Sequence, residues 1–144
     1  MPRMIKPAPM INQHKPYKNL FRHQEDFKVS YKFRSEDNGG RKVLPNQGIR
    51  FDFYYEHENH EIKGYFMIYP EFEDANGNLI TQGSVLRQGV ARMWILNPKL
   101  RAYHQERIQK GSRGYFLEGH KRVADCEVIE IVDLMKNPIE VNEA

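Results

Sequence analysis

The 144-residue chain has a single cysteine, Cys126, so it cannot form a disulfide within itself. It also lacks any apolar run near the roughly 20 residues that a membrane-spanning helix needs. The N-terminus is basic but has no apolar core of a secretory signal. A lone thiol is compatible with a reducing compartment. These absences predict a cytoplasmic protein that does not enter a membrane.

Two motifs of nucleotide and hydrolase chemistry are missing as well. The pattern Gly-x-x-x-x-Gly-Lys-Ser/Thr, which cradles phosphates, does not occur, so we expect no nucleotide hydrolysis by this chain. The nucleophile elbow Gly-x-Ser-x-Gly does not occur either. We therefore expect a protein that is not an enzyme and needs no cofactor.

What the chain does contain favours strands. Hydrophobic residues make up 40% and charged residues 28% of the sequence, as in a globular domain. The aromatic residues (8 Phe, 8 Tyr and 1 Trp) are types enriched in strands. This length is typical of one domain that buries about 70% of the surface of its unfolded chain.

Charge is segregated along the sequence, although the net charge is only +3. Residues 1–24 and 75–122 are basic, while residues 52–74 and 123–144 are acidic. Such blocks steer a polyanion or a charged protein if they form one face. Alternatively, the fold intermixes them and no patch exists.

Alternating apolar and polar residues predict a series of short strands. The clearest is 27–33, in which every second residue, beginning with Phe27, is apolar. The other expected strands are 49–56, 62–69 (ended by Pro70), 90–96, 114–118 and 122–132. In the last one the apolar parity changes after Val128, which predicts a β-bulge.

The segments between and beyond these strands are rich in turn residues. Glycine and asparagine predict turns at 36–40 and 74–78, and Pro98 and Gly111 leave little room for more than a short helical turn over residues 99–109. Residues 1–24 contain four prolines and predict an extended or partly disordered arm. We therefore expect a basic N-terminal arm over 1–24, a β-barrel domain over 25–134 and a polar C-terminal tail over 135–144.

Two glycine–arginine segments resemble a known family. The first run carries six matching residues: Gly39, Gly40, Arg41, Gly48, Arg50 and Phe53. The second run carries four at the family's spacing: Arg113, Glu118, Gly119 and Val123. In this order they resemble the C-terminal β-barrel of translation elongation factor Tu. The resemblance extends over about residues 27–132 and is poor over 56–90.

This resemblance implies a six-stranded antiparallel Greek-key β-barrel without the factor's GTPase domain. In the factor, the barrel contributes to binding the arm of aminoacyl-tRNA and an exchange factor. A fold hosts many functions, so these partners do not transfer with the fold.

The strongest candidate site is a basic one at the two matched turns. Its residues are Arg41, Lys42, Arg50, Arg113, His120, Lys121 and Arg122. Arginine forks suit phosphate or carboxylate groups, and the tyrosines Tyr54, Tyr65 and Tyr115 offer stacking surfaces for exposed bases. The alternative is that arginines such as Arg50 and Arg113 form ion pairs that hold the turns. The basic arm has the same two interpretations, contact with RNA or a cover over an edge of the barrel.

Other groups of residues are weaker candidates for a functional site. His57 and His60 are metal-ligand types, but they lie three residues apart in an expected loop, which favours a solvated turn. Cys126 is expected to be a buried small hydrophobe. The carboxylates Asp52, Glu56, Glu58 and Glu118 suit acid–base chemistry only if the fold brings them together.

The sequence therefore predicts a non-catalytic binding module that engages an RNA or protein partner through the arginine-bearing turns. The alternative is an enzyme or a metal-binding protein that uses the His57–His60 loop. The sequence carries no signal for the oligomeric state.

Overall fold

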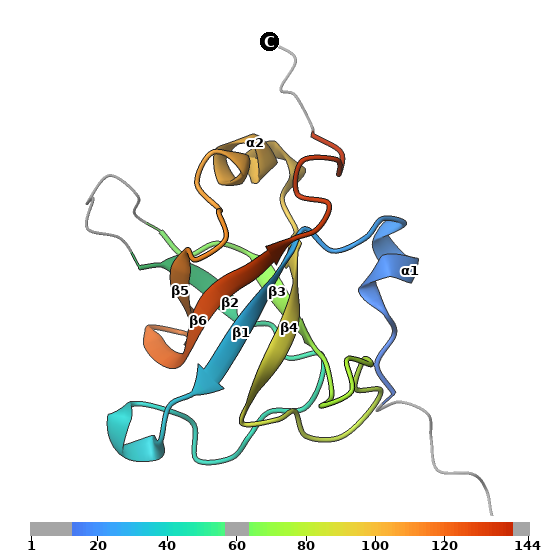
Figure 1. The fold of residues 1–144 in the computed structure, drawn as a ribbon. Coiled ribbons are helices and arrows are strands. Elements are labelled where there is room, and N and C mark those ends of the chain that lie inside the picture. The colour runs from blue at the N-terminus through green and yellow to red at the C-terminus, as the bar shows by residue number, and fades with distance from the viewer. Residues whose placement is uncertain (1–12, 57–63, 140–144) are drawn as a thin grey trace, which may run out of the picture.

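The computed structural model describes residues 13–56 and 64–139 of the chain. The main element of this part is a six-stranded antiparallel sheet that curls into a half-barrel (Figure 1). Its strands are β1 (Phe27–Phe33), β2 (Asp52–Tyr55), β3 (Ile68–Phe72), β4 (Gln88–Ile95), β5 (Arg113–Glu118) and β6 (Lys121–Ile131). The helical elements are α1 (Tyr17–Phe21), α2 (Arg101–Gln105) and two 3-10 turns at Glu36–Asn38 and Pro98–Leu100.

The strands lie in the order β2-β5-β6-β1-β4-β3, so β2 and β3 are the edges of the sheet. The edges meet at one bridge, in which the amides of Phe53 and Phe66 each donate to the other's carbonyl at 2.9 Å. This arrangement confirms the predicted all-β class with six antiparallel strands.

One predicted strand boundary is wrong. Pro70 was expected to end a strand over 62–69, but β3 spans Ile68–Phe72 with Pro70 in its middle; residues 62 and 63 lie outside the described part. It is tolerated there because β3 is an edge strand, where the amide hydrogen that proline lacks has no ladder partner to satisfy. The other expected strands agree with β1, β2, β4, β5 and β6 to within a few residues.

The predicted β-bulge is confirmed. Along β6, Val128 is opposite Val29 of β1, whereas Glu130 is opposite Lys28. Ile129 is therefore the extra residue, and it reverses the side of the sheet to which the following residues point. The two apolar parities of the sequence thus belong to a single strand.

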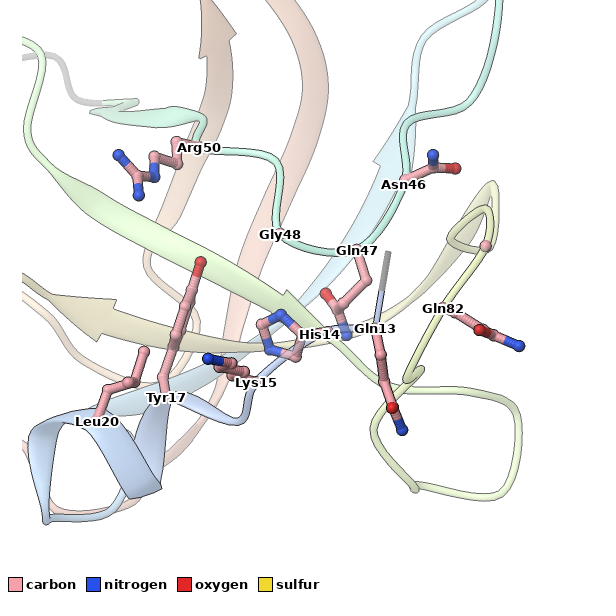
Figure 2. Close-up of a pocket in the computed structure, with 11 residues that line it drawn as sticks. Gln13, His14, Lys15, Tyr17, Leu20, Asn46, Gln47, Gly48, Arg50 and Gln82 are labelled. Carbon is pink, nitrogen blue, oxygen red and sulfur yellow. The ribbon is translucent and has the colours of Figure 1, made fainter. Parts of the chain in front are cut away.

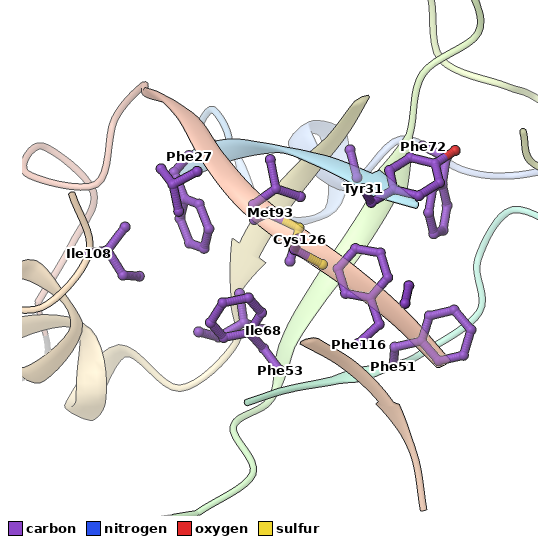
Figure 3. Close-up of a cluster of buried hydrophobic side chains, with 14 of the residues drawn as sticks. Phe27, Tyr31, Phe51, Phe53, Ile68, Phe72, Met93, Ile108, Phe116 and Cys126 are labelled. Carbon is purple, nitrogen blue, oxygen red and sulfur yellow. The ribbon is translucent and has the colours of Figure 1, made fainter. Parts of the chain in front are cut away.

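Aromatic side chains fill the inside of the curled sheet (Figure 3). The rings of Phe51 and Phe116 stack with centroids 5.7 Å apart. Phe53 packs over Gly114, where an added Cβ would lie 2.3 Å from the ring. Cys126 lies in the same core and is buried, as expected, and burial raises the pKa of its thiol well above its usual value.

A buried ion pair joins the ends of the central strands. The fully buried carboxylate of Asp26, just before β1, accepts from the Arg101 guanidinium at 3.1 Å and from the Ile95 amide at 2.8 Å. Asn137 donates to the same carboxylate at 2.9 Å. Arg101 also donates to the carbonyls of Ile95 and Pro138. The start of the expected polar tail is therefore packed against the domain, since the Asn137 side chain is buried and donates to Asp26.

Part of the expected N-terminal arm is helical rather than extended. Residues Tyr17–Phe21 form α1, which lies beside β4 (Figure 1). The rings of Tyr17, Phe21 and His23 lie 5.7–5.9 Å from that of Trp94, on the outward side of β4. Tertiary burial against Trp94 stabilises a helix that is too short to form alone. This segment covers the sheet next to its β3 edge.

We expect Arg101→Met to lower the free energy of unfolding by about 3–5 kcal/mol, because it leaves the Asp26 carboxylate buried without its cation. Urea denaturation measures the loss. The matched control is Arg113→Met, since Arg113 pairs with Glu127 at 3.4 Å on the surface and should contribute less than about 1 kcal/mol. Equal losses in the two variants would contradict the role of the buried pair.

Candidate functional site

A row of tyrosines crosses the outward face of β2 and β5. Tyr54 and Tyr115 are directly opposite on the two strands, with ring centroids 6.3 Å apart and ring planes 27° from parallel. Tyr65, which precedes the Phe66 bridge, continues the row at 5.6 Å from Tyr54. These are the three tyrosines that the sequence singled out as stacking surfaces. Tyr54 and Tyr115 alternate with the buried residues of β2 and β5 and so point outward, and Tyr65, which lies before β3, is 47% exposed.

Two arginines lie over this tyrosine row. The Arg122 guanidinium carbon is 4.4 Å from the Tyr115 ring centre and 5.4 Å from that of Tyr54. Arg34 approaches the same Tyr115 ring at 5.5 Å and is held there by Asp125, at 2.8 Å. Guanidinium groups favour aromatic faces because the ring quadrupole attracts a cation. We call Tyr54, Tyr65, Tyr115, Arg34 and Arg122 the tyrosine–arginine face.

The margin of this face carries polar groups that orient the rings. His120, in the turn between β5 and β6, lies 3.3 Å from the Tyr65 hydroxyl through Nδ1. Burial and the nearby Glu56, which is also hydrogen bonded to Tyr115, raise the pKa of Tyr115. The Tyr115 hydroxyl therefore stays protonated at neutral pH and donates its hydrogen to Glu56.

The seven predicted basic residues do not form one cluster. Arg41, Lys42 and Lys121 gather with Glu36 and Glu118 around the turn that follows β1. Arg41 pairs with Glu118 at 3.5 Å, so one matched segment contacts the other through this pair. Gly40 makes the turn possible, because an added Cβ would lie 1.8 Å from the carbonyl oxygen of Arg34.

The remaining predicted residues are distributed over three places. His120 and Arg122 belong to the tyrosine–arginine face and its margin. Arg113 pairs with Glu127 at 3.4 Å at the other end of β5. Arg50 lies in a separate groove, next to residues 13–20, and forms no ion pair with any residue that the structure describes.

The groove beside Arg50 was not recognised from the sequence. It has a volume of about 730 Å³ and is lined by residues 13–20, by the loop 46–50 and by Gln82 and Gly83 (Figure 2). Behind it lies Glu71, whose carboxylate accepts from His14 at 2.5 Å, from the Tyr17 amide at 2.9 Å and from the Trp94 indole at 3.1 Å. The acid in the otherwise apolar pattern of β3 was the available signal, but its partners are distant in sequence.

The predicted acid–base and metal sites are not assembled in the part of the chain that is described. Glu118 pairs with Arg41, while Asp52 lies on β2 opposite Leu117. His57, Glu58 and His60 lie outside the described residues. Within residues 13–56 and 64–139, no three His, Cys, Asp or Glu side chains are close enough to hold a metal ion.

One buried histidine was also missed. His104 of α2 lies in van der Waals reach of the core, and its Nδ1 is 2.5 Å from the hydroxyl of Tyr55. Burial, helped by Arg107 and Arg101, lowers the pKa of His104 to about 4. At neutral pH the imidazole is uncharged, so Tyr55 donates its hydroxyl hydrogen to Nδ1. The pair is shielded from solvent and connects α2 to β2.

Comparisons with known proteins leave the family open. The chain matches no family model and no curated protein sequence. None of the helices in the described segments is long and apolar enough to cross a membrane. The structure thus defines the class, a six-stranded antiparallel half-barrel, and an outward face of tyrosines and arginines.

We expect the stability to fall in acid because of His104. Its pKa is about 4 in the folded chain against 6.5 for a free histidine, so the unfolded chain binds more protons between these values. The free energy of unfolding should therefore be roughly 2–3 kcal/mol lower at about pH 4.5 than at about pH 7.5 from this residue alone. Urea denaturation at both pH values measures the difference.

The control for this prediction is His120→Gln, which removes an exposed histidine and should leave the pH dependence unchanged. His104→Leu should flatten it, whatever its effect on stability at neutral pH. A His104→Leu variant with the full acid loss would show that another group is responsible.

Proposed function

We propose that this chain is a non-catalytic binding module whose tyrosine–arginine face binds single-stranded RNA. The observation that supports this most directly is the row of rings Tyr65–Tyr54–Tyr115, in which Tyr54 and Tyr115 are near-parallel, Tyr65 meets Tyr54 edge to face, and Arg122 lies over Tyr115. Unpaired bases stack on aromatic rings and on guanidinium planes, whereas double-stranded RNA offers no free base faces. Tyr54, Tyr115 and Arg122 lie on paired strands, so these side chains are held in place before binding.

The surroundings of the face supply positive charge for the RNA backbone. Lys121 follows the turn that holds His120, and Arg41 and Lys42 lie close to Lys121. Such cations contact phosphates without reading the base sequence. Asp125 neutralises Arg34, so Arg122, Lys121 and Lys42 are the cations that we assign to phosphate contacts.

The proposal also includes the finer fold. We infer a Greek-key barrel of the kind found at the C-terminus of elongation factor Tu. The two glycine–arginine segments support this inference, because Arg41 of one contacts Glu118 of the other and Gly40 fits only as a glycine. RNA binding by that barrel in the factor is consistent with the proposed function, but the proposal is based on the tyrosine–arginine face.

A protein partner is the second candidate. The side chains of Tyr65 and Met67 are 47% and 51% exposed beside the bridge between β2 and β3. Exposed tyrosines and methionines are enriched in protein interfaces, and a sheet edge can accept an added strand. A protein partner would contact the apolar side chains at the sheet edge, whereas RNA bases would stack on the rings of the whole tyrosine row.

We expect a fluorescently labelled oligouridine to bind the chain with an affinity that falls steeply as salt increases, measured by fluorescence anisotropy. Tyr65→Ala should weaken binding about tenfold, because stacking on an aromatic ring contributes about 1–3 kcal/mol per base. Tyr65→Phe keeps the ring and should bind like the unaltered chain. Arg122→Gln should also weaken binding, whereas Lys110→Gln removes the same charge from a distant exposed loop and should not.

The RNA proposal is wrong if the oligouridine does not bind, or if Tyr65→Ala binds it as well as Tyr65→Phe does. In that case the protein candidate predicts that Met67→Asp abolishes association with a partner while Arg122→Gln leaves that association intact.

A further inference from the structure

We propose that the groove beside Arg50 is a binding site for a small phosphate monoester. The groove shares no lining residue with the tyrosine–arginine face. The inference is therefore independent of the proposed RNA binding. It rests on how the groove is built, on its charge and on its size.

The walls of the groove are held in place by hydrogen bonds from three segments. Gln47 donates its side-chain amide to the carbonyls of Phe72 and Ile80, at 2.7 and 2.9 Å, and accepts from the Phe72 amide at 2.8 Å. The His14 amide donates to the carbonyl of Thr81 at 2.6 Å. The groove is therefore formed before any ligand arrives, which reduces the ordering cost of binding.

The charge of the groove is positive. Lys15 and Arg50 are exposed cations in its lining, and no carboxylate of the described residues lines it. Glu71 lies behind the lining and is already bonded to His14, to the Tyr17 amide and to Trp94. Two cations suit the two negative charges of a phosphate monoester better than the single charge of a carboxylate.

The hydroxyl of Tyr17 adds a neutral donor to this site. The ring stands in the groove with its hydroxyl directed toward Arg50 (Figure 2). Burial and the Glu71 carboxylate raise the pKa of Tyr17, so the hydroxyl keeps its proton at neutral pH. Arg50 and Tyr17 are distant in the sequence, but the Tyr17 hydroxyl points toward Arg50 within the groove.

The size and the remaining lining indicate what carries the phosphate. A volume of about 730 Å³ exceeds what a free phosphate ion fills and lies in the range of small-molecule sites. The rest of the lining is rich in amides, from Gln13, Asn46 and Gln82. Amides donate and accept, so they suit a polar body such as a nucleoside or a sugar rather than an apolar one.

The test is an NMR titration of the full chain with AMP and, separately, with adenosine. We expect AMP to shift the Gly48 and Gly83 amide signals in a saturable way and adenosine to bind at least about tenfold more weakly, because it lacks the phosphate. A 5′-phosphorylated oligouridine and its unphosphorylated form distinguish a free small molecule from the end of an RNA strand as the source of the phosphate. The site is supported if AMP binds more tightly than adenosine, or if the phosphorylated oligouridine binds more tightly than its unphosphorylated form.

Variants locate the binding. Arg50→Gln and Lys15→Gln should each weaken AMP binding about tenfold, and both should fold normally because these side chains are exposed. Tyr17→Phe should weaken it by a smaller factor while keeping the ring contact with Trp94. Arg87→Gln removes an exposed arginine outside the groove and should have no effect.

Three results would overturn the proposal. One is the absence of a saturable shift at Gly48 with AMP up to about 10 mM and with the phosphorylated oligouridine. Another is equal binding of AMP and adenosine. The third is an Arg87→Gln variant that binds AMP as weakly as Arg50→Gln does.

Discussion

The buried ion pair between Asp26 and Arg101 is the interaction on which the arrangement of this protein depends. A fully buried carboxylate needs a cation and several donors, and Asp26 finds them in Arg101, the Ile95 amide and Asn137. These partners come from the end of β4, from α2 and from the segment after β6. The pair therefore sets where three segments meet at one end of the sheet.

The consequences of this pair extend to the outward face. Arg101 begins α2, and α2 places His104 against Tyr55 of β2. Side chains alternate between the two sides of β2. Because Tyr55 points inward, its neighbour Tyr54 faces solvent opposite Tyr115. A network that is buried for stability thus orients the edge strand whose tyrosines form the tyrosine–arginine face.

The two candidate sites differ in how the fold prepares them. The tyrosine–arginine face lies on adjacent strands, where cross-strand register alone brings Tyr54 and Tyr115 together. The groove beside Arg50 needs three segments that are separate in sequence, joined by Gln47 and by the amide of His14. Arg50 forms no ion pair with a described residue, whereas Arg41 and Arg113 are paired with Glu118 and Glu127. Arginines of similar sequence context therefore have different roles.

The sequence by itself determined the strand class, the bulge in β6 and Tyr54 as an outward residue, because alternation and parity are local properties of the backbone. It did not determine that Pro70 lies inside β3, since only the sheet order makes β3 an edge strand. Nor did it determine the partners of Asp26, Glu71 and His104, which lie between 23 and 111 residues away. The curling of the sheet decided these pairings and separated the basic residues into several places, because distances between strands depend on tertiary contacts.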